Sequence, residues 1–460
     1  MSENKKLNRG LKNRHIQLMA IGGAIGTGLF LGAGKSIHLA GPSILLVYLI
    51  IGIALFFVMR ALGELLIYRP TTGSFAAFAE EFIGPWAGFI TGWTYWFCWI
   101  ATAIAEITAV GIYIQFWFPA VPQWIPALIC VLALFILNMS TVRAFGEIEF
   151  WFALIKIIAI LALIAIGLVL VLAGFHNHET HAAFSNLWAN GGFFPNGFTG
   201  FVLSFQMAVF AFVGIELVGI TAGETDRPDK TLPKAINNIP IRILIFYIGA
   251  LLMIMSIYSW NDVSPSSSPF VQVFTMVGIP SAAGIVNFVV LTSAASSCNS
   301  GIFSTSRMLY SLGERGEAPG KLKVLNSRNV PAPALIASVI MLLIGVLLNY
   351  IIPNATTVFT LVTSIATICF IWVWGIILIA HLRFRKLKPE EARKNTFKMP
   401  FSPYINWIIL AFFVFVIVLL ALAADTRIAL FVTPVWFVLL VAAYLIRKAK
   451  KQGTQQHKQA

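Results

Sequence analysis

Long runs of apolar residues dominate the chain, and they restrict it to a fold that crosses a membrane. A helix needs about 20 apolar residues to span the roughly 30 Å hydrocarbon core of a bilayer. Hydrophobic residues make up 58% of the 460 positions and charged residues only 11%, proportions foreign to a soluble domain of this length. Twelve runs of suitable length are present: 16–39, 43–67, 85–118, 124–142, 150–173, 198–221, 239–258, 270–311, 334–353, 356–381, 403–424 and 428–447. The sequence therefore predicts an all-α integral membrane protein with twelve transmembrane helices.

The runs leave no room for a separate soluble domain. The third and eighth runs exceed one straight crossing, and we expect each to be a single tilted helix that continues into water, with no second span hidden in it. The expected membrane domain has these parts: a cytoplasmic tail at 1–15, a ten-helix core at 16–381, a cytoplasmic loop at 382–402, helices eleven and twelve at 403–447, and a second cytoplasmic tail at 448–460.

The formal net charge of +14 reflects orientation in the membrane rather than a nucleic-acid partner. With the amino terminus in the cytoplasm, all of the 32 Lys and Arg residues fall on the cytoplasmic side except Lys35, Arg427 and Lys156. Lys35 and Arg427 fall outside, and Lys156 falls within a span. This distribution follows the positive-inside rule. We therefore expect a multi-pass protein of the cytoplasmic membrane with both termini cytoplasmic, whose basic loops could contact anionic membrane lipid.

Cysteines and histidines form no catalytic or metal-binding pattern. The four cysteines all lie in apolar runs, where a disulfide or metal framework is not expected: Cys98, Cys130, Cys298 and Cys369. All seven histidines lie in tails, loops or helix ends. Three of them, at positions 176, 178 and 181, share one outer loop, where a surface metal site is the alternative to a solvated loop. We expect no cofactor, no metal and no enzymatic activity.

The first run carries a cluster of glycines that a continuous helix would not favour. The stretch 21–30 contains Gly22, Gly23, Gly26 and Gly28. Each glycine in a helix interior costs about 0.5–1 kcal/mol relative to alanine, so the cluster predicts an unwound stretch near the middle of the membrane. The alternative is close helix packing through Gly22 and Gly26, which have the spacing for it.

The sixth run has a second candidate break at 210–219, where Gly214 and Glu216 share one turn. If two groups of five helices form two halves, both breaks fall in the first helix of their half. Interrupted spans in corresponding positions indicate a transporter binding site. Freed N–H groups near Thr27 and Gly28 suit a carboxylate, and freed carbonyl groups suit an ammonium group. One cavity with both kinds of ligand would bind a small zwitterionic amino acid.

Three ionisable residues fall deep in the apolar runs: Glu106, Lys156 and Glu216. A charged side chain at the centre of a membrane helix costs about 2.5–3.5 kcal/mol on an insertion scale, so these groups should face the protein interior. Burial favours the uncharged form of such groups, which would let them take up and release a proton. The alternative is a static buried pair that only fixes packing.

Five segments along the chain carry a family resemblance: 20–30, 92–99, 150–156, 211–231 and 292–308. They resemble the amino acid–polyamine–organocation superfamily and, within it, the amino acid transporter family of proton symporters. The resemblance runs nearly end to end. It implies two inverted repeats of five helices plus two C-terminal helices, with the first and sixth helices broken at the substrate site.

The resemblance also implies roles for individual residues. The substrate carboxylate would bind the backbone amides of Gly26, Thr27 and Gly28. The substrate ammonium would bind the carbonyls of Ala24, Phe210 and Val213. Phe210 would also close over the substrate as a gate, for which a lipid-facing aromatic is the alternative.

Lys156 matches the family position where a lysine ammonium replaces a sodium ion, which favours proton coupling. Its neighbour in the serine-rich run 293–306 would be Ser296 or Ser297. Glu106 and Glu216 would share in coupling. The pocket for the substrate side chain should be small and apolar, with Ala103 in its wall. Family resemblance favours D-alanine, D-serine and glycine as substrates, and the alternatives are other neutral amino acids such as L-alanine, L-serine, proline or GABA.

Overall fold

The computed structural model describes residues 22–71, 73–140, 142–177, 180–221, 228–352 and 354–459. Within these ranges the chain is helical, apart from turns, loops and one isolated β-bridge between His176 and His181, and it contains no strand. The α-helices are α2 (Thr27–Phe30), α3 (Gly32–Ala40), α4 (Ile44–Tyr68), α5 (Ser74–Phe82), α6 (Pro85–Gln115), α7 (Trp124–Asn138), α8 (Val142–Leu172), α9 (Asn186–Ala189), α10 (Gly197–Leu203), α11 (Phe205–Phe210), α12 (Leu217–Thr221), α13 (Pro228–Ile257), α14 (Pro269–Met276), α15 (Pro280–Glu314), α16 (Ala332–Ile351), α17 (Ala355–Leu387), α18 (Pro389–Lys394), α19 (Tyr404–Leu422) and α20 (Arg427–Gln459).

Nine helical stretches among the described residues are long and apolar enough to cross a membrane. One of them, Gly32–Tyr68, joins α3 to α4 through the short 3₁₀ turn Gly41–Ser43. Two shorter apolar stretches, Trp124–Asn138 and Gly197–Phe210, add to these. The expected all-helical, multi-pass membrane fold is therefore confirmed, whereas the number twelve stays a prediction.

Several helices extend beyond the apolar runs that predicted them. α8 begins at Val142 rather than at 150, α13 begins at Pro228 rather than at 239, and α20 continues to Gln459. Polar residues can continue a helix where its end reaches water. Hydropathy alone therefore predicted the starts of α8 and α13 too late and the end of α20 too early.

The prediction of one helix over 270–311 was wrong. Gly278 has a φ of +84°, a conformation open mainly to glycine, and it separates α14 from α15. Pro280 then starts α15, as proline favours the first turn of a helix. α14 is only 8 residues long and too short to be a second span.

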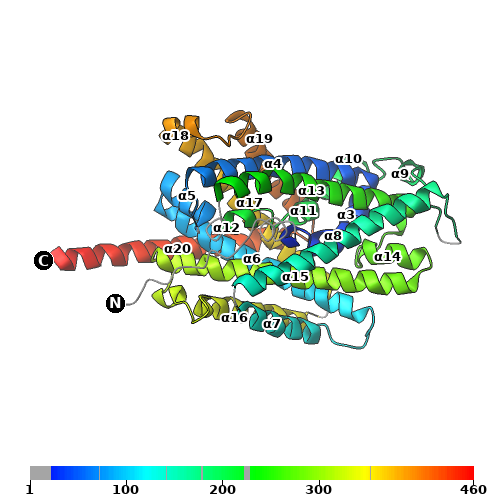
Figure 1. Cartoon of the computed structure of the whole chain (residues 1–460), viewed down its shortest axis with the longest axis horizontal. Coiled ribbons are helices and arrows are strands. Elements are labelled where there is room, and N and C mark those ends of the chain that lie inside the picture. The colour runs from blue at the N-terminus through cyan, green and yellow to red at the C-terminus, as the bar shows by residue number, and fades with distance from the viewer. Residues whose placement is uncertain are drawn as a thin grey trace.

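The long helices run side by side along the longest dimension of the molecule (Figure 1). α6 packs along both α15 and α17, and α4 packs along α13. α6 and α17 are buried over most of their apolar length, whereas α8 and α20 expose most of theirs. At one end of the bundle lie α5, α18 and the projecting end of α20, and α9 and α14 lie at the other (Figure 1).

A buried polar junction, which the apolar runs did not single out, joins three of these helices. Glu64 of α4 is fully buried and bonds His381 at 3.0 Å and Arg385 at 2.7 Å, both in α17. The backbone N–H of Met399 donates to the same carboxylate at 2.6 Å. Asn406 of α19 contacts the other ring nitrogen of His381 at 3.1 Å. Glu64 therefore links α4 to α17 and to the segment that precedes α19. None of these contacts involves a residue of the two helix breaks.

Candidate substrate site at two helix breaks

The first expected interruption is present, at Ile25 and Gly26, where the chain leaves a helical conformation before α2 begins. The Lys156 ammonium, from α8, donates to the carbonyls of Gly22 at 2.6 Å and Ile25 at 3.0 Å. Ser293 of α15 donates to the same Ile25 carbonyl at 2.9 Å. Side chains from two other helices thus bind carbonyl groups that the break leaves without helical partners.

The amide side of the first break faces a carboxylate of the protein itself. Glu106 of α6 is 2% exposed, and its two oxygens lie 3.3 and 3.4 Å from the Thr27 nitrogen, which donates to them. A Cβ atom on Gly26 would lie 2.5 Å from Glu106 Oε1 and 2.9 Å from Ser297 Oγ, so any other residue here would push these two side chains out of place. The Thr27 N–H group is thus bound by a carboxylate of the protein in this conformation, and a substrate carboxylate would have to take the place of Glu106.

The second expected interruption is also present, where residues 211–216 form turns between α11 and α12. Gly214 has a φ of +102°, and its N–H donates to the carboxylate of Glu216 at 3.2 Å. The Tyr95 hydroxyl of α6 donates to the same carboxylate at 3.4 Å. Within the turn, the Val213 N–H donates to the Phe210 carbonyl at 3.1 Å. This break satisfies much of its backbone with its own residues.

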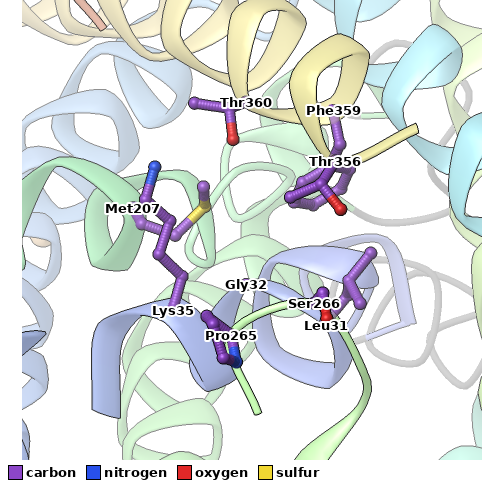
Figure 2. Close-up of a pocket in the computed structure, with 9 residues that line it drawn as sticks. All are labelled: Leu31, Gly32, Lys35, Met207, Pro265, Ser266, Thr356, Phe359 and Thr360. Carbon is purple, nitrogen blue, oxygen red and sulfur yellow. The ribbon is translucent and has the colours of Figure 1, made fainter. Parts of the chain in front are cut away.

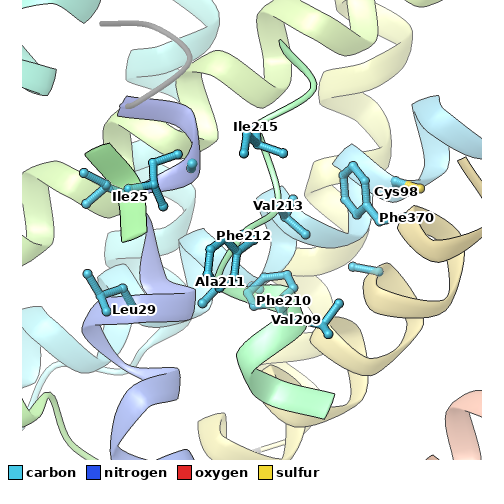
Figure 3. Close-up of a cluster of buried hydrophobic side chains, with 14 of the residues drawn as sticks. Ile25, Leu29, Cys98, Val209, Phe210, Ala211, Phe212, Val213, Ile215 and Phe370 are labelled. Carbon is cyan, nitrogen blue, oxygen red and sulfur yellow. The ribbon is translucent and has the colours of Figure 1, made fainter. Parts of the chain in front are cut away.

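The two breaks lie against each other. A Cβ on Gly28 would come within 2.5 Å of the Ala211 Cα, and a Cβ on Gly214 would come within 2.7 Å of the Gly23 carbonyl carbon. Figure 3 shows Phe210, Ala211 and Phe212 of the second break beside the segment that carries Ile25 and Leu29. Glycines at 28 and 214 therefore permit a backbone contact that any side chain would prevent.

The expected site is enclosed in this conformation. None of its non-glycine side chains is more than 4% exposed, and Gly26 and Gly28 are buried as well. Phe210 ends α11, and its ring packs edge-on against Phe359 of α17 with centroids 6.3 Å apart. Phe359 also lines a small pocket that includes Met207 and holds only about 10 Å³ of open space (Figure 2). A substrate would need a movement of the helices to enter or leave.

The structure gathers most of the expected residues, though unevenly. Glu106, Lys156 and Ser297 all reach the first break, and Ser297 donates to the Gly23 carbonyl at 3.4 Å. Phe210, Val213 and Glu216 belong to the second break or its edge. Ala103 is buried on α6 one turn before Glu106, a spacing that puts both on one helix face. The Ala24 carbonyl accepts hydrogen bonds from the Gly26 N–H at 3.1 Å and from the Tyr247 hydroxyl at 2.6 Å.

Near the first break, sequence reasoning missed the buried ionisable group Glu149, as it missed Glu64 elsewhere. Glu149 is fully buried in α8 and accepts hydrogen bonds from Ser296 at 2.6 Å and Asn299 at 3.2 Å. The signal was available, because Glu149 precedes Lys156 by seven residues and so lies on the same helix face. It was missed because the helix was expected to start at 150. Ser293, which shares the Ile25 carbonyl with Lys156, was missed as well.

The histidine-containing loop gives no support to a metal site. His176 and His181 pair through their backbones, and His178 lies outside the described residues. Within the described ranges, no three His, Cys, Asp or Glu side chains are grouped as metal ligands.

Comparison with known proteins identifies the family. A profile of amino acid permeases matches residues 15–456. The chain belongs to the amino acid permease family. It is 62% identical to the amino-acid permease AapA of Bacillus subtilis, over 97% of this chain and 96% of that one. It is 63% identical to the uncharacterized transporter YdgF of the same organism, over 97% of both chains. It is 54% identical to the D-serine/D-alanine/glycine transporter of Escherichia coli K12, over 97% and 95% of the two chains. The family is one of membrane transporters and not of enzymes.

Proposed function

We propose that this permease takes up small neutral amino acids together with protons, with D-alanine, D-serine and glycine as preferred substrates. The observation that carries the proposal is the contact between the two breaks, where an N–H group able to bind a carboxylate and freed carbonyl groups meet in one enclosed place. The similarity to the D-serine/D-alanine/glycine transporter supports the choice of substrates.

In the proposed site the substrate carboxylate binds the amides of Gly26, Thr27 and Gly28. Its ammonium group binds carbonyls, proposed as those of Ala24, Phe210 and Val213. Phe210 closes over the substrate, a role supported by its place at the end of α11, where its ring packs against Phe359. The substrate side chain lies toward Ala103, where a small apolar wall leaves room for little more than a methyl or hydroxymethyl group.

Proton coupling is proposed for the buried ionisable groups around the breaks. Lys156, Glu106 and Glu149 are buried close to the first break, and one ammonium group cannot balance two carboxylates. A proton on one acid would restore neutrality, and its movement would change which groups hold Thr27 and Ile25. Ser297 and Glu216 complete the proposed coupling set. A proton drives transport only if it binds the two conformations with different affinity.

The finer architecture belongs to the same proposal. We infer twelve transmembrane helices in the cytoplasmic membrane, with two inverted repeats of five in 16–381 and two further helices in 403–447. Both termini and the 382–402 loop would be cytoplasmic, as the distribution of Lys and Arg supports.

Uptake by purified protein in liposomes tests the proposal. Labelled glycine should accumulate when an inward proton gradient is imposed, and an uncoupler should abolish the accumulation. Unlabelled D-alanine, D-serine and glycine should compete best, and lysine or tryptophan should compete poorly. Stronger competition by L-alanine, L-serine, proline or GABA would transfer the assignment to that substrate. Glycine uptake that is the same with and without the proton gradient would refute proton coupling.

A further inference from the structure

A tyrosine of α13 contacts both breaks at once. Tyr247 is fully buried, and its hydroxyl oxygen lies 2.6 Å from the Ala24 carbonyl and 2.6 Å from the Ala211 carbonyl. Ala24 directly precedes the first break and Ala211 opens the second. The hydroxyl therefore joins two segments that are 187 residues apart in sequence, from Ala24 to Ala211.

Both carbonyls need a hydrogen-bond donor, because no water or lipid group in the membrane interior replaces a missing helical partner. The Ala24 carbonyl also accepts from the Gly26 N–H at 3.1 Å. A hydroxyl has a single hydrogen, so Tyr247 can donate to only one of the two carbonyls at a time. The pair is left with acceptor capacity to spare, as a site for an ammonium group requires.

We propose that Tyr247 is a positioning residue for the substrate ammonium: its hydroxyl holds the carbonyls of Ala24 and Ala211 in register so that they can accept from the bound amino acid. This inference rests on the proposed function, and it adds Tyr247 and a fourth carbonyl, that of Ala211, to the ammonium side of the site. The glycines at 28 and 214 let the two breaks approach, and Tyr247 supplies the hydrogen bond that fixes their relative position.

The chain offers a matched control in the same aromatic cluster. Tyr48 of α4 is fully buried, and its ring lies 5.7 Å from that of Tyr247. Phe212 packs against both rings, at 5.6 Å from Tyr48 and 5.1 Å from Tyr247. The Tyr48 hydroxyl, however, has no hydrogen-bond partner among the described residues. Removing either hydroxyl leaves the ring packing intact, but only one removal affects the breaks.

The experiment compares Tyr247→Phe with Tyr48→Phe in the glycine uptake assay. Tyr247→Phe should raise the KM for glycine at least tenfold with a smaller change in maximal rate, because misaligned carbonyls weaken substrate binding. Tyr48→Phe should keep the native KM. Melting temperature in detergent and protein amount in the membrane are measured for both, since a purely structural role would reduce the number of active transporters and leave KM unchanged.

Each outcome decides the proposal. A native KM in Tyr247→Phe, or an equal rise in both variants, would overturn it. Failure of Tyr247→Phe alone to insert would assign the hydroxyl to folding and would also overturn it. The native protein is measured in the same assay. If it transports no small zwitterionic amino acid, the proposed function itself is wrong, and this result is distinct from a failure of the Tyr247 proposal.

Discussion

The two helix breaks are satisfied in opposite ways. At the first break, side chains from other helices bind the freed backbone: Lys156 from α8, Ser293 from α15 and Glu106 from α6. At the second break, turn hydrogen bonds and its own Glu216 bind several of the backbone groups. The outside contacts there are neutral hydroxyls, from Tyr95 to Glu216 and from Tyr247 to the Ala211 carbonyl. The first break depends on charged groups that are distant in sequence, whereas the second is largely built from itself.

This difference separates two tasks that one site must perform. A break held by remote charges responds when a proton changes those charges, because its backbone ligands are then released or reordered. A break held by its own turns keeps its shape through such a change. We therefore expect the first break to carry most of the coupling, and substitutions at the two breaks to differ in size of effect.

Removal of the Lys156 ammonium should have the largest effect. Lys156→Met keeps a long side chain, but it leaves the Gly22 carbonyl without the ammonium, the Ile25 carbonyl with Ser293 alone, and two buried acids without a cation. Concentrative uptake of labelled glycine into liposomes should be abolished. Lys394→Met, at an exposed position on α18, serves as the control and should transport normally. If correctly inserted Lys156→Met still accumulates glycine in response to a proton gradient, the first break has no part in proton coupling.

Neutralising Glu106 should come next. In Glu106→Gln an amide oxygen can still accept from Thr27, but without charge, and a hydrogen bond to a charged group is worth about 1.5–3 kcal/mol. Initial uptake rates should fall by about tenfold to hundredfold. Glu390→Gln, on an exposed residue, controls for loss of an acid elsewhere. Uptake equal to that of the control would mean that the Thr27 contact has no part in transport.

The corresponding change at the second break should be milder. In Glu216→Gln the side-chain oxygen can still accept from the Gly214 N–H, so the turn should persist and glycine binding should stay within about threefold of native. Native uptake should fall as external pH rises, because the proton becomes scarce. The variant should show a flatter profile in the same measurement. A native pH profile would show that Glu216 takes no part in coupling.

The smallest effect is expected for Ser293→Ala. The Ile25 carbonyl loses a neutral donor but keeps the Lys156 ammonium, and such a bond contributes about 0.5–1.5 kcal/mol. Because the ammonium remains, the loss should lie at the low end of this range, and uptake should fall by about two- to threefold. Thr292→Ala, whose hydroxyl bonds only within its own helix turn to Val289, provides the neighbouring control. A loss as severe as that in Lys156→Met would make the serine, and not the ammonium, the principal ligand of this carbonyl.

The sequence predicted those features whose cause is local. Gly26 and Gly214 predicted where helices stop, because a glycine favours conformations that a helix interior does not use. Apolar length predicted the membrane helices, since the bilayer imposes one dimension on all of them. Gly278, by contrast, divides a predicted helix. The signal was present, because Pro280 follows two residues later, but the apolar run on both sides concealed it.

Features that depend on distant segments could not be predicted in this way. Thr27 and Glu106 are 79 residues apart, and Ala24 and Tyr247 are 223 apart, so their contacts exist only after the helices pack. Tyr247 carries no sequence signal, because an aromatic in an apolar run is ordinary. Glu149 was within reach of sequence reasoning, but the helix was predicted to start at 150 rather than at Val142, which placed Glu149 just outside it.

The contact of Gly23 with Gly214 also bears on how such a chain can be recombined with its relatives. Gly23 lies before the loop around residue 190 and Gly214 lies after it, and a Cβ at 214 would strike the backbone at 23. A chimera that joins the halves of two permeases in the loop around residue 190 inherits one glycine from each parent. We expect function in such hybrids to follow this single pair of positions more closely than overall identity between the parents.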